Sequence, residues 1–307
     1  MTKPKITFLM LAYNTEKYIE KAVNSILNQT ETNINLIVRN NGSTDKTGDL
    51  LRQMAASDER MHIIENKNNW YADDGSCYIA SGIVRIWPIQ NKELLGEYIS
   101  IVDSDDWLRP DFAERLYQGA NDFDADIAVC GHTYMHDGIT KGSDRLPPDL
   151  CTENLANESE RIRTEFMSLY NVFRCYWGKL FKTTFFLKHY DEAWQSVGDR
   201  SLLDTATMLR YLRCCRGFAS VCEPLYQFRV STATYKSRFP DGLRVMEAET
   251  LWEEGWQFLS TFGAHSDKTD RDLLCLNYAY MDEYLSWIKI KNDESGFQQL
   301  ACGYFSL

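Results

Sequence analysis

Strand-like and helix-like segments alternate through the N-terminal part of the sequence, and this alternation constrains the fold more than any other feature. Residues 6–12 form a continuous apolar run of strand length, and apolar residues then recur at helical spacing over 18–29. Strand patterns follow at 34–38 and 61–64, with a helical pattern around 50–54 between them. Parallel strands connected by helices produce this order. We therefore predict an α/β fold with a Rossmann-like, mostly parallel central sheet flanked by helices.

An acidic cluster follows the next strand pattern, at 98–102. It places Asp103, Asp105 and Asp106 within four residues, directly before Trp107. Open α/β sheets bind ligands at the carboxyl ends of their strands. Closely spaced carboxylates raise one another's pKa unless a cation lies among them, and their oxygens suit Mg²⁺ or Mn²⁺. Taken alone, these residues fit a solvated turn equally well, because Asp and Ser are common in turns.

Polar residues also follow the first two strand patterns. Asn14 comes after the first, and Asn40 and Asn41 end the second. The carboxyl ends of parallel strands share one edge of a sheet, so these residues should meet the acidic cluster there. That edge is the predicted ligand site.

The later part of the chain has a mixed pattern. We predict strands at 126–131 and 224–230, and a turn or mobile loop at 138–150, which is rich in Gly, Pro, Asp and Ser. Helical patterns lie at 158–170, 203–214, 247–262 and 273–290.

Composition and cysteine spacing exclude several classes of protein. The net charge of -11 argues against a nucleic-acid partner or a strongly anionic membrane surface. The nine cysteines show no C-x-x-C pair, which predicts reduced thiols and a cytoplasmic protein. The polar residues 1–5 predict no signal peptide, and no apolar segment reaches the length of a membrane span.

The order of the motifs resembles glycosyltransferase family 2, whose fold is the nucleotide-diphospho-sugar (GT-A) fold. The matching elements are Ala-Tyr-Asn after the first strand, Asn-Gly-Ser-Thr-Asp after the second, and Asp-Ser-Asp-Asp-Trp at the acidic cluster. The resemblance covers roughly residues 5–238. It implies a GT-A domain at 1–238, with a nucleotide-binding half to about 131 and an acceptor half at 132–238. Residues 239–307 form a predicted C-terminal helical extension.

The resemblance also implies a donor site for a nucleotide-diphospho-sugar, with a UDP-sugar as the expected donor. In the family, the nucleoside lies against the first two loops, which here are Ala12, Tyr13, Asn14, Asn40 and Asn41. The Asp-x-Asp element assigns the ribose to Asp103 and Ser104, and the divalent metal, Mn²⁺ or Mg²⁺, to Asp105 and Asp103. A metal there neutralises the negative charge that develops on the leaving nucleoside diphosphate.

A third element, residues 203–209, resembles the family's Glu-Asp segment at the start of a helix below the acceptor. The resemblance implies that Asp204 is the general base, which takes the proton of the acceptor hydroxyl during an inverting attack. Asp199 is the reserve candidate. A plain helix-capping role for Asp204 stays open, because Asp commonly caps helix N-termini.

Two more segments are similar to bacterial members of the family. Residues 223–229 resemble the segment that closes the domain, and Trp177-Gly178-Lys179-Leu180 resembles a Trp-Asn-Lys-Leu motif. Trp177 fits either a platform on which a sugar stacks or a core aromatic residue.

The sequence departs from the family pattern at several positions. Asn40-Asn41 replaces two aspartates, which leaves the base specificity open, since an amide both accepts and donates. The usual Ala-Arg-Asn segment is absent from a loop-rich insertion at 70–95, where Arg85 is a weak substitute. Leu203 stands where the family has Glu. The Gln-x-x-Arg-Trp motif of processive synthases is missing, which predicts transfer of a single sugar.

The sequence therefore predicts an inverting, metal-dependent glycosyltransferase of surface polysaccharide biosynthesis, with a glycan or lipid-linked acceptor. Peripheral association with the inner face of the membrane and a homodimer through the C-terminal helices are further expectations. The alternative is a non-catalytic nucleotide-sugar-binding or scaffolding subunit, suggested by Asn40-Asn41 and Leu203. A nucleotidyltransferase would need a Gly-rich, basic loop after the first strand, and residues 12–16 are neither.

Overall fold

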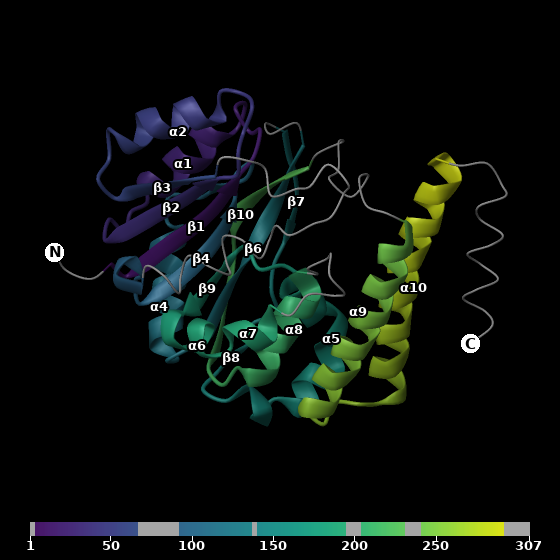
Figure 1. Cartoon of the computed structure of the whole chain (residues 1–307). Helices are drawn as coiled ribbons and strands as arrows, with labels where there is room; N and C mark the ends of the chain where they lie inside the picture. Colours follow the sequence, from purple (N-terminus) through teal and green to yellow (C-terminus); the bar gives the residue numbers. More distant parts are fainter. Residues whose placement is uncertain (1–3, 67–91, 137–139, 195–203, 231–240, 292–307) are drawn as a thin grey trace.

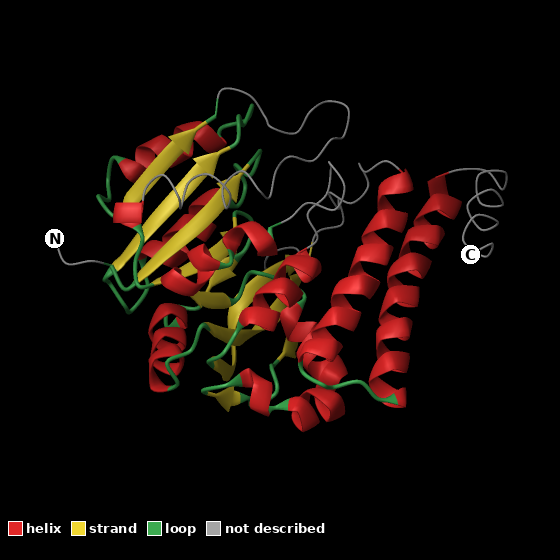
Figure 2. Cartoon of the chain, turned by 60° about the horizontal axis from the view of Figure 1, so that its bottom comes forward, coloured by secondary structure: helices red, strands yellow, loops and turns green. Residues whose placement is uncertain are grey.

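A mixed sheet, with ten strands in the part of the chain that the structure describes, forms the centre of the protein, with helices on both of its faces (Figures 1 and 2). The computed structural model describes residues 4–66, 92–136, 140–194, 204–230 and 241–291. In order across the sheet, the main strands are β3 (Met61–Glu65), β2 (Ile34–Asn40), β1 (Ile6–Ala12), β4 (Tyr98–Asp103), β9 (Lys179–Lys182), β6 (Ile127–His136), β10 (Phe218–Val230) and β5 (Trp107–Leu108). Strand β7 (Thr140–Arg145) pairs with β6, and β8 (Cys151–Thr152) pairs with β10.

The helices divide between the two faces. Their bounds are α1 (Ile19–Leu27), α2 (Thr47–Ala55), α4 (Phe112–Asp122), α5 (Ser159–Phe173), α6 (Thr183–Lys188), α7 (Tyr190–Ala193), α8 (Asp204–Cys214), α9 (Asp241–Thr261) and α10 (Asp267–Lys291). Two 3-10 turns lie at Lys92–Leu94 and Leu155–Asn157.

The N-terminal half of the sheet is parallel, as the alternating pattern predicts. Strand β1 pairs in parallel with β2 and β4, and β2 pairs in parallel with β3. Within these pairs Ala12 lies opposite Asn40, and Leu11 lies opposite Asp103. The pairing therefore brings the polar ends of three strands to one edge of the sheet.

The other half of the sheet is mixed, because β9 runs against the direction of its neighbours. Strand β9 lies antiparallel between β4 and β6, while β6 and β10 are parallel to each other. The predicted loop at 138–150 was wrong in part, because it contains β7, which pairs antiparallel with β6. Most side chains of 141–145 are exposed, so this strand is held by backbone hydrogen bonds and lacks the apolar pattern of a buried strand.

Side chains of β1 point alternately to two hydrophobic clusters, one on each face. Phe8 and Met10 pack with α1 and α4, whereas Leu9 packs in the cluster that contains α5, α6, α7 and α8. All three are fully buried. Burying a side chain of this size contributes about 1.5–3 kcal/mol, so a strand that is apolar on both faces is stable only at the centre of such a sheet.

The predicted C-terminal helices are present, and they pack onto the domain. Helices α9 and α10 lie side by side next to α5 and α8 (Figure 1). Phe258 of α9 and Phe262, which directly follows that helix, share a hydrophobic cluster with Phe166 of α5. The predicted domain boundary at 238/239 lies outside the described residues, but the core continues across it.

Among the described residues, no helix combines the length and the apolar character that crossing a membrane requires. Their cysteines, seven in number, are all free thiols.

Candidate active site

Three carboxylates from two distant segments lie near enough to one another at the end of β4 for their charges to interact. Asp103 is the last residue of β4, Asp105 follows in the turn, and Asp204 is the first residue of α8. Burial raises the pKa of Asp103 well above its usual range, and the negative charges of Asp105 and Asp204 raise it further. Charges separated by water-filled space affect each other weakly beyond about 10 Å. The structure therefore brings the predicted metal ligands and the predicted base into one site.

This cluster suits a divalent cation. Oxygen ligands from Asp103 and Asp105 fit Mg²⁺ or Mn²⁺, and a cation between them would remove the mutual repulsion that raises the pKa of Asp103. Oδ2 of Asp105 accepts a hydrogen bond from the guanidinium of Arg229. That guanidinium lies over the ring of Tyr18, 4.0 Å from its centre. A cation bound at this cluster would therefore compete with Arg229 for the Asp105 carboxylate.

Asp106 has a positioning role in the acidic turn. Its side chain is buried, and its Oδ2 accepts a hydrogen bond from the Tyr226 hydroxyl at 2.8 Å. Its Oδ1 accepts a hydrogen bond from the backbone N–H of Arg229 at 2.7 Å. The Tyr226 oxygen in turn accepts from the backbone N–H of Asp103 at 3.3 Å. The acidic turn is thus fixed to β10 from both sides.

The loops that follow β1 and β2 are joined by hydrogen bonds. Asn14 has a positive φ of 51°, and its Oδ1 accepts from the backbone N–H of Thr44 at 2.8 Å. The backbone N–H of Asn14 donates to Ser43 Oγ at 3.1 Å, and that of Asn41 donates to the carbonyl of Ala12 at 2.8 Å. Asn tolerates the left-handed conformation better than most residues. Ala12, Tyr13, Asn14, Asn40 and Asn41 therefore lie in one connected pair of loops.

The side chains of Asn40 and Asn41 are buried and already bonded within the protein. Nδ2 of Asn40 donates to Glu65 at 2.7 Å, and its Oδ1 accepts from the backbone N–H of Ser43 at 3.1 Å. Oδ1 of Asn41 accepts from Asn66 at 2.9 Å. These contacts shape the loop. Glu65 and Asn66 were not among the predicted site residues, although they begin the polar segment after the third strand.

Asp204 lies near the C-terminal end of α5, since the hydroxyl of the next residue, Thr205, donates to the backbone carbonyl of Arg174 at 3.0 Å. Nζ of Lys179, 2% exposed, donates to the backbone carbonyls of Val172 (2.8 Å), Trp177 (3.3 Å) and Cys175. Burial lowers the pKa of Lys179 to about 8. The negative charge of Asp204 acts in the opposite direction and raises the same pKa. Three sequence candidates, Arg85, Asp199 and Leu203, lie outside the described residues, as does most of the 70–95 insertion.

Trp177 lies at the boundary between core and surface. Its indole stacks on Tyr226 (ring centres 4.6 Å apart, 17° between planes) and on Phe228 (5.2 Å, 23°), and it remains partly exposed. His132 packs edge-on against it at 5.0 Å. Gly178 has a φ of 67°, a conformation open to Gly and tolerated by Asn, which explains how Trp-Gly-Lys-Leu can replace Trp-Asn-Lys-Leu.

Comparison with known proteins agrees with this geometry. The family model named glycosyl transferase family 2 matches residues 7–74. Glycosyltransferase GlyA of Streptococcus pneumoniae is 30% identical over 186 residues, which cover 59% of this chain and 25% of GlyA. A Bacillus subtilis relative named as glycosyltransferase EpsH is 27% identical over 259 residues, which cover 82% of this chain and 70% of EpsH. The chain thus corresponds to only a quarter of the first relative and to most of the second.

Two solved structures share the fold. Residues 1–349 of Staphylococcus aureus TarS, in complex with UDP, align with a TM-score of 0.61 at 15% identity, over 96% of this chain and 78% of that TarS segment. The mannosyltransferase PcManGT from Pyrobaculum calidifontis, in complex with GDP-Man and Mn²⁺, aligns with a TM-score of 0.53 at 14% identity, over 99% and 80% of the chains. The predicted GT-A fold is confirmed, and the family model and the relatives that match this chain are those of glycosyltransferases.

Proposed function

We propose that this protein is an inverting, divalent-metal-dependent glycosyltransferase. It moves one sugar from a nucleotide-diphospho-sugar to a hydroxyl of a glycan or lipid-linked acceptor in polysaccharide biosynthesis. The observation that carries the proposal is that Asp204 lies near enough to Asp103 and Asp105, which a separate stretch of the chain supplies, for its charge to act on Asp103. An inverting transfer needs a donor site and a base on opposite sides of the reacting carbon, and this arrangement provides carboxylates for both.

In the proposed reaction, Asp204 accepts the proton of the acceptor hydroxyl. The hydroxyl oxygen forms a bond to the anomeric carbon as the bond from that carbon to the diphosphate oxygen breaks, which inverts the configuration. The first turn of α8 presents Asp204, and Lys179 and the end of α5 support that turn. Aromatic side chains around Trp177 offer an apolar surface beside the same carboxylates, suited to the face of an acceptor sugar.

The divalent ion is assigned to Asp103 and Asp105. When bound, Mn²⁺ or Mg²⁺ would supply positive charge for the departing diphosphate. Asp106, Tyr226 and the backbone of Arg229 hold these two carboxylates in place.

A UDP-sugar is the proposed donor. Asn40 and Asn41 form the loop through internal hydrogen bonds, so recognition of the base is assigned to the backbone and to Tyr13 and Asn14. The nucleotide can be tested by thermal shift with UDP, GDP and their sugars, each with and without Mn²⁺. A ligand at 100 times its Kd stabilises the fold by about 2.7 kcal/mol. Stabilisation by GDP and not by UDP would reassign the donor.

The role of Asp204 is tested by Asp204→Asn, with transfer to water or to a panel of saccharides as the assay. Loss of a general base lowers turnover by about 10² to 10⁴. The matched control is Asp122→Asn, an exposed aspartate at the end of α4, which should keep full activity. Turnover of Asp204→Asn within a few fold of the wild type would exclude this residue as the base.

A non-catalytic nucleotide-sugar-binding subunit is the second candidate, and the pairing of Arg229 with Asp105 favours it. In that case the guanidinium replaces the metal, and the protein binds donors without consuming them. Calorimetry and turnover assays on the same samples separate the two. Nucleotide binding that needs no divalent ion, with no turnover across donors and acceptors, would establish the binding subunit.

Association through the C-terminal helices remains a proposal. Trp256 of α9 and Leu274 and Tyr278 of α10 are among the most exposed large apolar residues that the structure describes. Such side chains suit a homodimer or a contact at the membrane surface. Light scattering of the wild type and of a variant with Leu274→Glu and Tyr278→Glu tests the dimer.

A further inference from the structure

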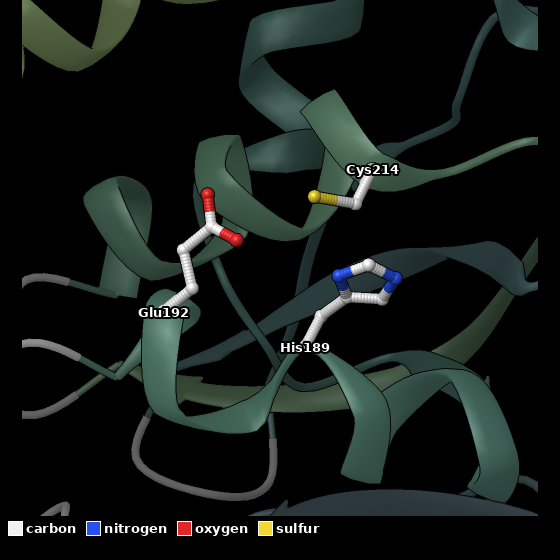
Figure 3. A group of neighbouring side chains, drawn as sticks. All are labelled: His189, Glu192 and Cys214. Carbon is white, nitrogen blue, oxygen red and sulfur yellow. The ribbon is translucent and has the colours of Figure 1, made fainter.

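A second group of metal-binding side chains lies away from the acidic strand end. His189 stands between α6 and α7, Glu192 is on α7, and Cys214 is the last residue of α8. One ligand atom of each, a ring nitrogen, a carboxylate oxygen and the sulfur, lies within 4.8 Å of the others. Figure 3 shows the three side chains directed toward one another from two separate helical segments.

We propose that His189, Glu192 and Cys214 bind a zinc-class transition metal ion, with water as the fourth ligand. Imidazole nitrogen, thiolate sulfur and carboxylate oxygen are the usual zinc ligands, and three protein ligands plus water make a tetrahedral set. From bond lengths of about 2.0–2.3 Å, tetrahedral ligand atoms lie roughly 3.3–3.8 Å apart. The observed spread therefore closes with side-chain movements on the order of 1 Å.

The three ligand groups are available for a metal. Among the residues described, none forms a hydrogen bond or an ion pair with the His189 ring, the Glu192 carboxylate or the Cys214 thiol. The His189 ring packs on the ring of Phe185, with 5.1 Å between the ring centres. Burial lowers the pKa of His189, so its imidazole is neutral and can donate a lone pair. Burial also raises the pKa of the Cys214 thiol, and the metal must displace that proton to solvent.

The charges around the group favour a divalent ion once the thiol is ionised. Glu192 and the Cys214 thiolate supply two negative charges, which neutralise Zn²⁺. The nearby cations are Lys188 and Arg213, and Arg213 is already paired with the buried Glu254. Among the described residues, Lys188 is thus the unpaired cation that opposes binding, and it is exposed to solvent, which screens its charge.

The position of this site in the fold gives it a consequence. Cys214 ends the helix that Asp204 begins, so a metal on Cys214 would fasten the far end of α8 to the α6–α7 segment. The chemistry also separates it from the acidic cluster. Asp103 and Asp105 offer oxygen alone and suit Mn²⁺ or Mg²⁺, whereas nitrogen and sulfur select zinc-class ions.

The test uses untagged, full-length protein stripped of metal and titrated with Co²⁺, which replaces Zn²⁺ and reports on sulfur. A thiolate ligand produces a sulfur-to-cobalt charge-transfer band in the near ultraviolet. We expect the band to saturate at one ion per chain and to disappear when Zn²⁺ is added. His189→Gln and Glu192→Gln should weaken Co²⁺ binding by about tenfold or more, and Cys214→Ser should abolish the band.

Two controls make the result specific. Cys275→Ser removes an exposed thiol on α10 and should leave the band unchanged, and so should Asp105→Ala, which alters the oxygen-only site. Because the band does not depend on sugar transfer, its outcome is independent of the proposed function. A wild type without the band, or a Cys214→Ser or His189→Gln variant that keeps it at full intensity and affinity, would overturn the proposal. Circular dichroism confirms that each variant is folded, and Glu192→Gln provides the test if the others are not.

Discussion

Removing the Glu254 carboxylate should strongly destabilise the protein, because this group is the polar contact between α8 and α9. Its side chain is buried, and it accepts from Arg210 Nε at 2.6 Å and from the guanidinium of Arg213. The two arginine side chains are themselves only 9% and 15% exposed. Glu254→Ala would leave both cations without their shared anion in a poorly solvated place.

Breaking a buried ion pair on one side costs about 3–5 kcal/mol. For a chain of 307 residues, with roughly 2.1 cal/mol/K of unfolding entropy per residue, that loss lowers Tm by roughly 5–8 °C. Calorimetry or urea unfolding measures the change. The matched control is Glu253→Ala, which removes an exposed carboxylate from the adjacent position and should cost less than about 0.5 kcal/mol.

A cost for Glu254→Ala below about 1 kcal/mol, equal to that of Glu253→Ala, would refute the reasoning. It would mean that water reaches the two arginines, and hence that α9 packs less closely on α8 than this structure indicates. The result bears on function, because α8 carries Asp204 at its first position.

Three further changes test other parts of the structure. Tyr226→Phe should cost about 1–3 kcal/mol in urea unfolding and weaken Mn²⁺ binding, because it removes the hydroxyl shared by Asp106 and the Asp103 backbone. Gly178→Asn should change the free energy of unfolding by less than about 0.5 kcal/mol, whereas Gly178→Val should lower it by more than about 1 kcal/mol. The reason is the φ of 67° at this position, which Asn tolerates and Val does not. Equal losses of stability in the two variants would contradict this. Burial lowers the pKa of His132 to about 4 in the folded protein, whereas the ordinary value is about 6.5. As the pH falls between these two values, the unfolded state binds the proton and the folded state does not. The free energy of unfolding therefore decreases in this window, by at most about 3 kcal/mol. In His132→Gln this part of the pH dependence should be absent. If the free energy of unfolding decreases equally with falling pH in the variant and in the wild type, the prediction is disproved.

The parallel half of the sheet was predictable because its strands are buried on both faces. Residues 6–12 and 34–38 are apolar except for Thr7 and Asn35, and runs of this kind are typical of parallel strands that are buried on both faces. Strand β7 was not predictable in this way. It lies against β6 through backbone hydrogen bonds, and its polar residues resemble those of a turn. The order β4-β9-β6 depends equally on contacts between distant segments, which local patterns do not encode.

The site shows the same division. Asp103, Asp105 and Asp204 could be named from motif order, and the sheet edge brings the first two to a single turn. The partners that fix their positions could not be named, because Tyr226 and Arg229 contact residues more than 100 positions earlier in the chain. For Asn40 and Asn41 the sequence indicated the right loop and left the orientation of the side chains open.

Arg229 links the two halves of the site. Its backbone N–H bonds to Asp106, its guanidinium bonds to Asp105, and both contacts fix the end of β10 to the turn after β4. A divalent ion bound by Asp105 would compete with the guanidinium for the same carboxylate and would weaken that contact. This linkage is reciprocal. The factor by which the bound ion weakens the contact between Arg229 and Asp105 is also the factor by which that contact weakens binding of the ion. The position of the β10 end and the occupancy of the proposed metal site are therefore coupled through a single carboxylate.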